Sequence, residues 1–65
     1  MIYVTVMYKN KYSDKTAVKD AEVASKYVAA IISVFKHNRI IDDIEKIETF
    51  DIDTKEQKQV YPKVS

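Results

Sequence analysis

The stretch AVKDAEVASKYVAAIISVFKH, residues 17–37, decides the fold of this 65-residue chain. Five of its positions are alanine, the best helix former, and neither glycine nor proline interrupts it. We therefore predict one long helix over residues 17–37, with Thr16 or Ser13 as its N-cap. His37-Asn38 is the predicted C-terminus, with Asn38 standing in for the glycine that commonly follows a helix.

This helix would carry more apolar surface than a single packing partner needs. With about 100° between successive residues, the polar side chains gather within about 100° and the apolar arc covers about 200°. A first apolar stripe suits packing against a sheet and consists of Ala17, Ala21, Ala24, Val28, Ile31, Ile32 and Phe35. A second stripe, called the helix stripe below, consists of Val23, Tyr27, Ala30 and Val34.

The spacing of the helix stripe is typical of a seam between two helices. We predict that it forms a homodimer interface, because two-fold dimers are the commonest oligomers and a self-complementary face suits them. A foreign protein is a second candidate for this surface. Alternatively, residues 38–47 fold back over the stripe with their isoleucines.

The remaining chain reads as strands and turns. Residues 2–8, IYVTVMY, form the clearest strand, with Ile2, Val4, Val6 and Tyr8 facing the core. A polar loop is expected over residues 9–16, and a connection with one helical turn over residues 40–46.

Two further strands are predicted over residues 45–52 and 57–61, joined by a hairpin turn over residues 53–56. Pro62 cannot donate to a strand ladder, so it should end the last strand or lie at an edge. The predicted fold is α+β, in the order β-α-β-β, with the helix packed on a three-stranded antiparallel sheet. Residues 1–65 form a single domain, since the chain is too short for two.

Several side chains are candidates for contacting a target. If Ile47 and Thr49 face the core, Phe50 lies on the far face of the sheet beside Tyr3 and Met7. An exposed apolar patch of this kind usually marks a binding site. Tyr12 and Tyr61 are also expected near the surface, and tyrosine is enriched in protein interfaces.

A basic loop adds a second kind of candidate surface. Lys9, Lys11, Lys15 and Lys19 form a basic loop around Tyr12, and Lys26, Lys36 and Arg39 would extend the patch along the helix. Lysines neutralise phosphates and aromatic rings stack on bases, which suits nucleic acid. The net charge of only +1 argues against a strong polyanion binder.

The composition points away from catalysis, cofactors and metals. The chain has no cysteine and no glycine, which excludes thiolate metal sites and glycine-rich phosphate loops. The one histidine, His37, falls on the polar side of a helix end, and no nucleophile accompanies it. Asp51 and Asp53 are too few ligands for a calcium loop. No apolar run is long enough to span a membrane and the start lacks the features of a signal peptide, so we expect a cytoplasmic protein.

The general style of the chain resembles that of small accessory proteins encoded by phages and mobile elements of AT-rich genomes. It is tiny, free of glycine and rich in Lys, Ile and Asp, with the segment Ile47-Glu-Thr-Phe-Asp51 before a hairpin. Many such proteins bind and block one host protein, including anti-CRISPR proteins and phage-encoded antitoxins. The resemblance implies an inhibitor that works in the host cytoplasm.

From the residues and this resemblance we expect a small non-enzymatic module, a homodimer that binds a host protein or a protein–nucleic acid complex. The alternative is a small nucleic-acid-associated protein that uses the basic loop and the helix face.

Overall fold

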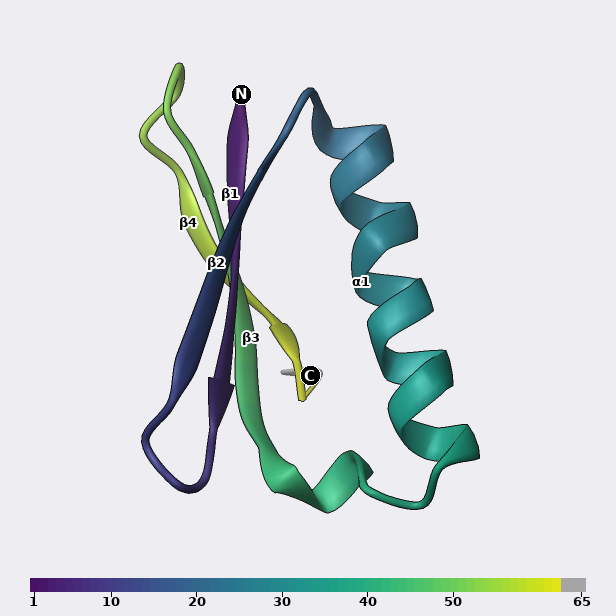
Figure 1. The fold of residues 1–65 in the computed structure, drawn as a ribbon. Helices are drawn as coiled ribbons and strands as arrows, with labels where there is room; N and C mark the ends of the chain where they lie inside the picture. Colours follow the sequence, from purple (N-terminus) through teal and green to yellow (C-terminus); the bar gives the residue numbers. More distant parts are fainter. Residues whose placement is uncertain (63–65) are drawn as a thin grey trace.

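A computed structural model describes residues 1–62 of the chain as two layers, a sheet with one helix against it (Figure 1). The elements along the chain are β1 (Ile2–Tyr8), β2 (Ser13–Val18), α1 (Ala21–His37), a 3₁₀ turn η1 (Ile41–Asp43), β3 (Ile44–Asp51) and β4 (Gln57–Tyr61). The α+β class and the antiparallel sheet are confirmed. The predicted order β-α-β-β was wrong, because an additional strand stands before the helix.

The sheet has four antiparallel strands in the order β2-β1-β3-β4, where three were predicted. β1 and β3 are its central strands, and β2 and β4 are its two edges. The additional strand is β2, which occupies part of the expected loop over residues 9–16. It pairs with β1 without a break from Met7 opposite Ser13 to Ile2 opposite Val18.

The β1–β2 hairpin turns without glycine, which is why its strand was read as loop. Lys11 takes the left-handed conformation, with φ of 73°, and its amide donates to the carbonyl of Tyr8 over 3.0 Å. The Asn10 side chain accepts from the Tyr12 amide over 3.1 Å. A left-handed lysine is uncommon, so the sequence carries no glycine signal at the turn.

The helix begins at Ala21 rather than at residue 17. Asp20 is its N-cap, and the Asp20 carboxylate accepts from the Val23 amide over 3.0 Å. The predicted caps Thr16 and Ser13 were wrong, since both residues lie in β2. Ala17 is likewise a strand residue and does not belong to the helical packing stripe.

The C-terminus of α1 falls where it was predicted, but a different residue makes the turn. Asn38 is the C-cap with φ of −87°, and Arg39 takes the left-handed conformation with φ of 60°. The Ile40 amide donates to the Phe35 carbonyl over 2.9 Å, and the Arg39 amide donates to the Lys36 carbonyl over 3.1 Å. This pair of bonds is a Schellman motif.

The core lies between α1 and the inward face of the sheet. Ile2, Val4 and Val6 are buried, as their alternation predicted. The other buried side chains are Ala24 and Val28 of α1 and Ile44 and Ile47 of β3. Of the predicted helical packing stripe, Ile31, Ile32 and Phe35 pack against this core, and Ala21 is exposed.

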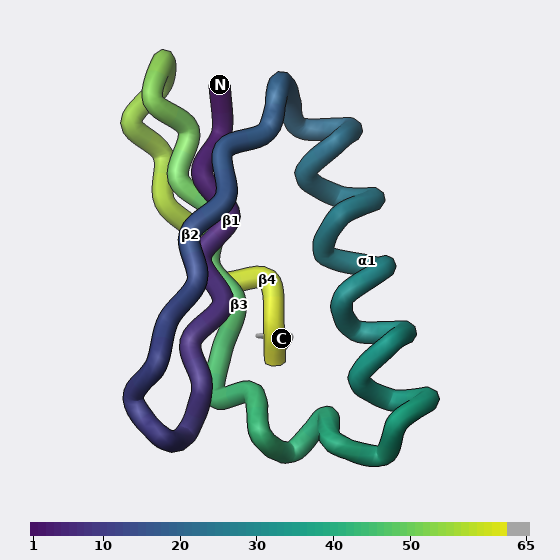
Figure 2. The backbone as a smooth tube through the Cα atoms, viewed as in Figure 1, coloured from purple at the N-terminus to yellow at the C-terminus, as the bar shows by residue number. Residues whose placement is uncertain are grey.

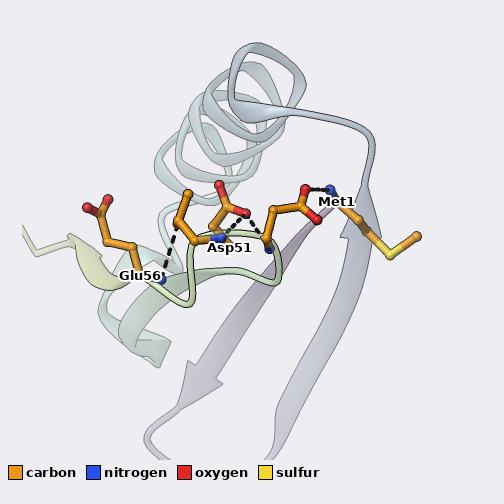
Figure 3. A network of polar contacts seen from close by, with 5 residues as sticks. Met1, Asp51 and Glu56 are labelled. Atoms are coloured by element: carbon orange, nitrogen blue, oxygen red, sulfur yellow. Dashed lines mark hydrogen bonds and ion pairs between the residues drawn. The ribbon is translucent and has the colours of Figure 1, made fainter.

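Connections close the two layers at both ends, as the tube in Figure 2 shows. The α1–β3 connection contains η1, the helical turn expected between residues 40 and 46. At the other end residues 19–20 connect β2 to α1. The β3–β4 turn lies at this end of the sheet, and within it the Asp51 carboxylate accepts from the Asp53 amide over 2.9 Å (Figure 3). β4 ends directly before Pro62, as predicted.

Candidate interaction surfaces

The face of the sheet turned away from α1 carries an aromatic pair at its centre. Tyr3 of β1 lies directly opposite Phe50 of β3, and the alternation of both strands places these side chains on the face away from the core. Met7 lies on the same face. The Lys15 ammonium lies over the Tyr3 ring, 5.2 Å from its centroid, which is the geometry of a cation–π contact.

These side chains line a shallow hollow of about 380 Å³, to which all four strands contribute. Its lining includes Tyr3, Met7, Lys15, Phe50 and Gln57. We call this surface the open face. In the described part of the chain no second layer covers it, and Phe50 is 37% exposed. The structure therefore brings together four of the predicted target-binding residues, namely Tyr3, Met7, Lys15 and Phe50.

The open face is close to neutral. Glu48 sits within it, and the Glu48 carboxylate is 3.8 Å from the Lys46 ammonium. The Gln57 side-chain amide donates to the same carboxylate over 3.3 Å. The Glu48 carboxylate offsets the charge of Lys46, which leaves Lys15 as the remaining charged side chain on the face. The face therefore offers apolar and hydrogen-bonding contacts more than charge.

The other predicted target-binding residues lie elsewhere. Lys9, Lys11 and Tyr12 are at the exposed tip of the β1–β2 hairpin, where Tyr12 is 74% exposed. Tyr61 lies opposite Ile47 in the β3–β4 ladder and packs against the core, so it does not belong to the open face.

The predicted basic residues do not form one patch. Lys9 and Lys11 precede β2, and Lys19 follows it, so a six-residue strand of about 20 Å separates them. Lys15 extends over Tyr3, and the Lys26 ammonium pairs with the Glu22 carboxylate over 3.6 Å on the solvent side of α1.

The helix stripe lies along the β2 side of α1. Tyr27 fixes this orientation, because its hydroxyl is 3.2 Å from the Thr16 hydroxyl of β2 and its ring packs against the core. Val23 and Val34 are 41% and 55% exposed, and Ala30 is also exposed. The stripe therefore projects over the free edge of β2.

Residues 38–47 do not cover the stripe. Ile44 is buried in the core, and Ile41 packs against the core. Ile40 is itself 41% exposed. The fold-back alternative is thus wrong for Val23 and Val34, although β2 does cover part of Tyr27.

A groove that the sequence did not predict lies on the side of α1 away from the helix stripe. It has a volume of about 720 Å³ and runs between Val28 and Ile32 of the helix and Lys58 and Val60 of β4. A helix about 10 Å wide covers about two strands spaced 4.8 Å apart. Since α1 packs mainly on β1 and β2, the inward face near β4 stays uncovered. A correct count of four strands would have indicated this groove.

Within residues 1–62, no group of three or more histidine and carboxylate side chains is arranged to hold a metal ion. His37 is exposed at the end of α1. No helix in that range is long and apolar enough to cross a membrane.

Neither a protein-family model, nor a curated protein sequence, nor a solved structure matches this chain.

Proposed function

We propose that this protein is a non-catalytic binding domain that uses the open face to occupy the surface of a partner protein. The observation that carries the proposal is the cross-strand pair of Tyr3 and Phe50, placed on the two central strands of an uncovered sheet. Paired aromatic rings on a rigid ladder offer a large contact area at little cost in conformational entropy. Met7 extends the apolar area, and Lys15 and Gln57 supply polar contacts around it.

In this proposal the domain acts by blocking its partner. The resemblance in style to small phage-encoded inhibitors supports a host protein, alone or bound to nucleic acid, as the partner. The cytoplasm is then the expected place of action. Lys9, Lys11 and Tyr12 on the hairpin tip are exposed and available for further contacts at the rim.

Single-stranded nucleic acid is a second candidate ligand for the same face. Tyr3 and Phe50 lie side by side, as rings that stack on successive bases do. The Glu48 carboxylate within the face and its pairing with Lys46 weigh against this candidate, because bound phosphates would meet little free positive charge.

The test is retention of partners on the immobilised protein, compared with a Tyr3→Ser, Phe50→Ser double variant. Both ring positions are on the sheet surface away from the core, so the variant is expected to fold, which circular dichroism checks. Ile40→Ser, at an exposed position after α1 and outside both the open face and the helix stripe, is the matched control. We expect a protein that binds the wild type and the control, resists nuclease and is lost with the double variant.

Two outcomes would contradict the proposal. Retention that nuclease abolishes and that falls steeply with salt would assign the face to nucleic acid. A protein retained equally by the double variant would show that the binding site lies on another surface.

A further inference from the structure

The free edge of β2 and the helix stripe above it form one continuous surface. Alternation along an antiparallel ladder gives each β2 residue a defined direction. The Tyr8 amide donates to the Tyr12 carbonyl, so Tyr12 turns its backbone groups towards β1. Every second residue after Tyr12 does the same, namely Asp14, Thr16 and Val18. The amides and carbonyls of Lys15 and Ala17 consequently point away from the sheet.

The two edges of the sheet differ in how they are protected against pairing. β4 has a register shift between Ile47 and Glu48 of its partner strand, and Pro62 follows its last residue. Bulges and prolines are the usual means of blunting an edge. β2 pairs with β1 over six residues with no register shift and contains no proline. The open edge is therefore β2, on the side where Val23 and Val34 are exposed.

We propose that a second copy of this chain pairs its β2 antiparallel to β2, so that the two sheets become one and the two helix stripes face each other. The proposal concerns the chain alone and does not depend on the open face binding a target.

Distances favour a second copy as the occupant of this edge. Paired strands lie about 4.8 Å apart, and α1 packs over both β1 and β2. The two helix axes would then lie about 10 Å apart across the two-fold axis, within the range at which helices pack. Tyr27 lies at the level of Thr16, and Ala30 follows it on the same side, so a small residue sits where the helices come close.

Charge selects the register of the strand pair. With Lys15 at the two-fold axis, two like charges would face each other, which destabilises a ladder. With Thr16 at the axis, Thr16 faces Thr16 of the second copy, a favourable pair, and Lys15 faces Ala17. This register also places Asp14 opposite Val18 and Ser13 opposite Lys19 of the second copy, so no like charges face each other. The outward backbone groups of Lys15 and Ala17 then bond to each other.

The experiment is the mass in solution, measured by light scattering over a range of concentrations. We expect the wild type to reach twice the chain mass of 7.6 kDa. Ala17→Pro removes an outward amide that β1 does not use, and Val34→Glu places a charge in the helix contact. Both variants are expected to remain folded and to fall to the mass of one chain.

Each variant has a matched control that should leave the mass doubled. Ala17→Thr retains the backbone amide, and Ser33→Glu adds the same charge on the solvent side of α1. Amide hydrogen exchange of the wild type gives a second reading that needs no variant. The Lys15 and Ala17 amides should exchange slowly at high concentration and quickly on dilution.

A wild type that stays at the mass of one chain would overturn the proposal. So would a doubled mass that survives Ala17→Pro with fast exchange at Lys15 and Ala17, because the helices would then pair without the strands. The target test is separate, since the Tyr3→Ser, Phe50→Ser variant should keep the doubled mass.

Discussion

Within residues 1–62, three non-glycine residues with positive φ give this glycine-free chain its sharp turns. Lys11, Arg39 and Lys55 have φ of 73°, 60° and 60°. The Cβ atom makes this conformation unfavourable by roughly 1–2 kcal/mol for each such residue. The surrounding hydrogen bonds hold the turns in place, as the Schellman bonds do at Arg39. The chain therefore contains local strain that glycine would relieve.

Arg39→Gly should consequently stabilise the protein by about 0.5–1 kcal/mol, after the greater entropy of glycine in the unfolded chain is included. Urea denaturation measures this change. Lys36→Gly, within the helix, is the control and should destabilise by about 1 kcal/mol. Equal destabilisation by both substitutions would mean that Arg39 is not held in the left-handed conformation.

Tyr8 connects the hairpin to the helix and titrates abnormally. Its ring stacks on Phe35 with centroids 6.1 Å apart. Burial raises the pKa of the Tyr8 phenol above its ordinary value of 10.0, and the nearby Asp14 carboxylate and Tyr27 add to the rise. The unfolded chain therefore releases this proton at a lower pH than the folded protein does.

The stability linked to Tyr8 is thus present below pH 10.0 and is lost as the pH rises through the folded pKa. Urea denaturation across alkaline pH should show this loss in the wild type. Tyr8→Phe should remove its share of the loss, and Tyr12→Phe at the hairpin tip should not. An identical pH dependence in all three proteins would contradict the assignment to Tyr8.

At the scale of elements, the start of α1 depends on a single carboxylate. Asp20 accepts from the Val23 amide and satisfies one of the free donors of the first turn. Asp20→Ala should destabilise the protein by about 1 kcal/mol, as measured by urea denaturation. Ser13→Ala, at a position that lies in β2, should change stability by no more than a few tenths of a kcal/mol. A larger effect of Ser13→Ala would indicate that the helix begins earlier.

The sequence predicted the elements whose side-chain pattern is strong. Ile2, Val4 and Val6 alternate with less apolar residues, and the first strand was placed correctly. The alanine-rich run forms the helix, whose end was predicted but whose start lies at Ala21 instead of residue 17. β2 was missed because Ser13, Asp14 and Lys15 are poor strand formers in isolation. They are strand residues because β1 supplies a complete ladder for them, which is a tertiary effect.

The same omission limited what was predicted of the surfaces. The open face was anticipated from the positions of Tyr3, Met7 and Phe50, and Lys15 joins it only because β2 places it over Tyr3. The helix stripe was recognised from its spacing, but its relation to a free strand edge requires β2. The groove beside β4 likewise follows from having four strands and one helix.

As a whole molecule, the protein has one layer of helix for four strands, so much of its sheet is uncovered. A chain of 65 residues buries only about 60% of the surface that its unfolded form exposes. Association is a common support for domains of this size. We therefore propose separate surfaces for separate partners: the β2 edge with the helix stripe for a second copy, and the open face for a target protein.

Photo-crosslinking from the open face, in the cells where the protein acts, tests most directly whether this face binds a protein. A photoreactive phenylalanine analogue is placed at Phe50, and at Ser33 on the solvent side of α1 in a second protein. We expect a discrete, nuclease-resistant protein adduct from position 50 and none from position 33. An adduct from position 33 alone, or an adduct at position 50 that nuclease removes, would contradict binding of a protein at the open face.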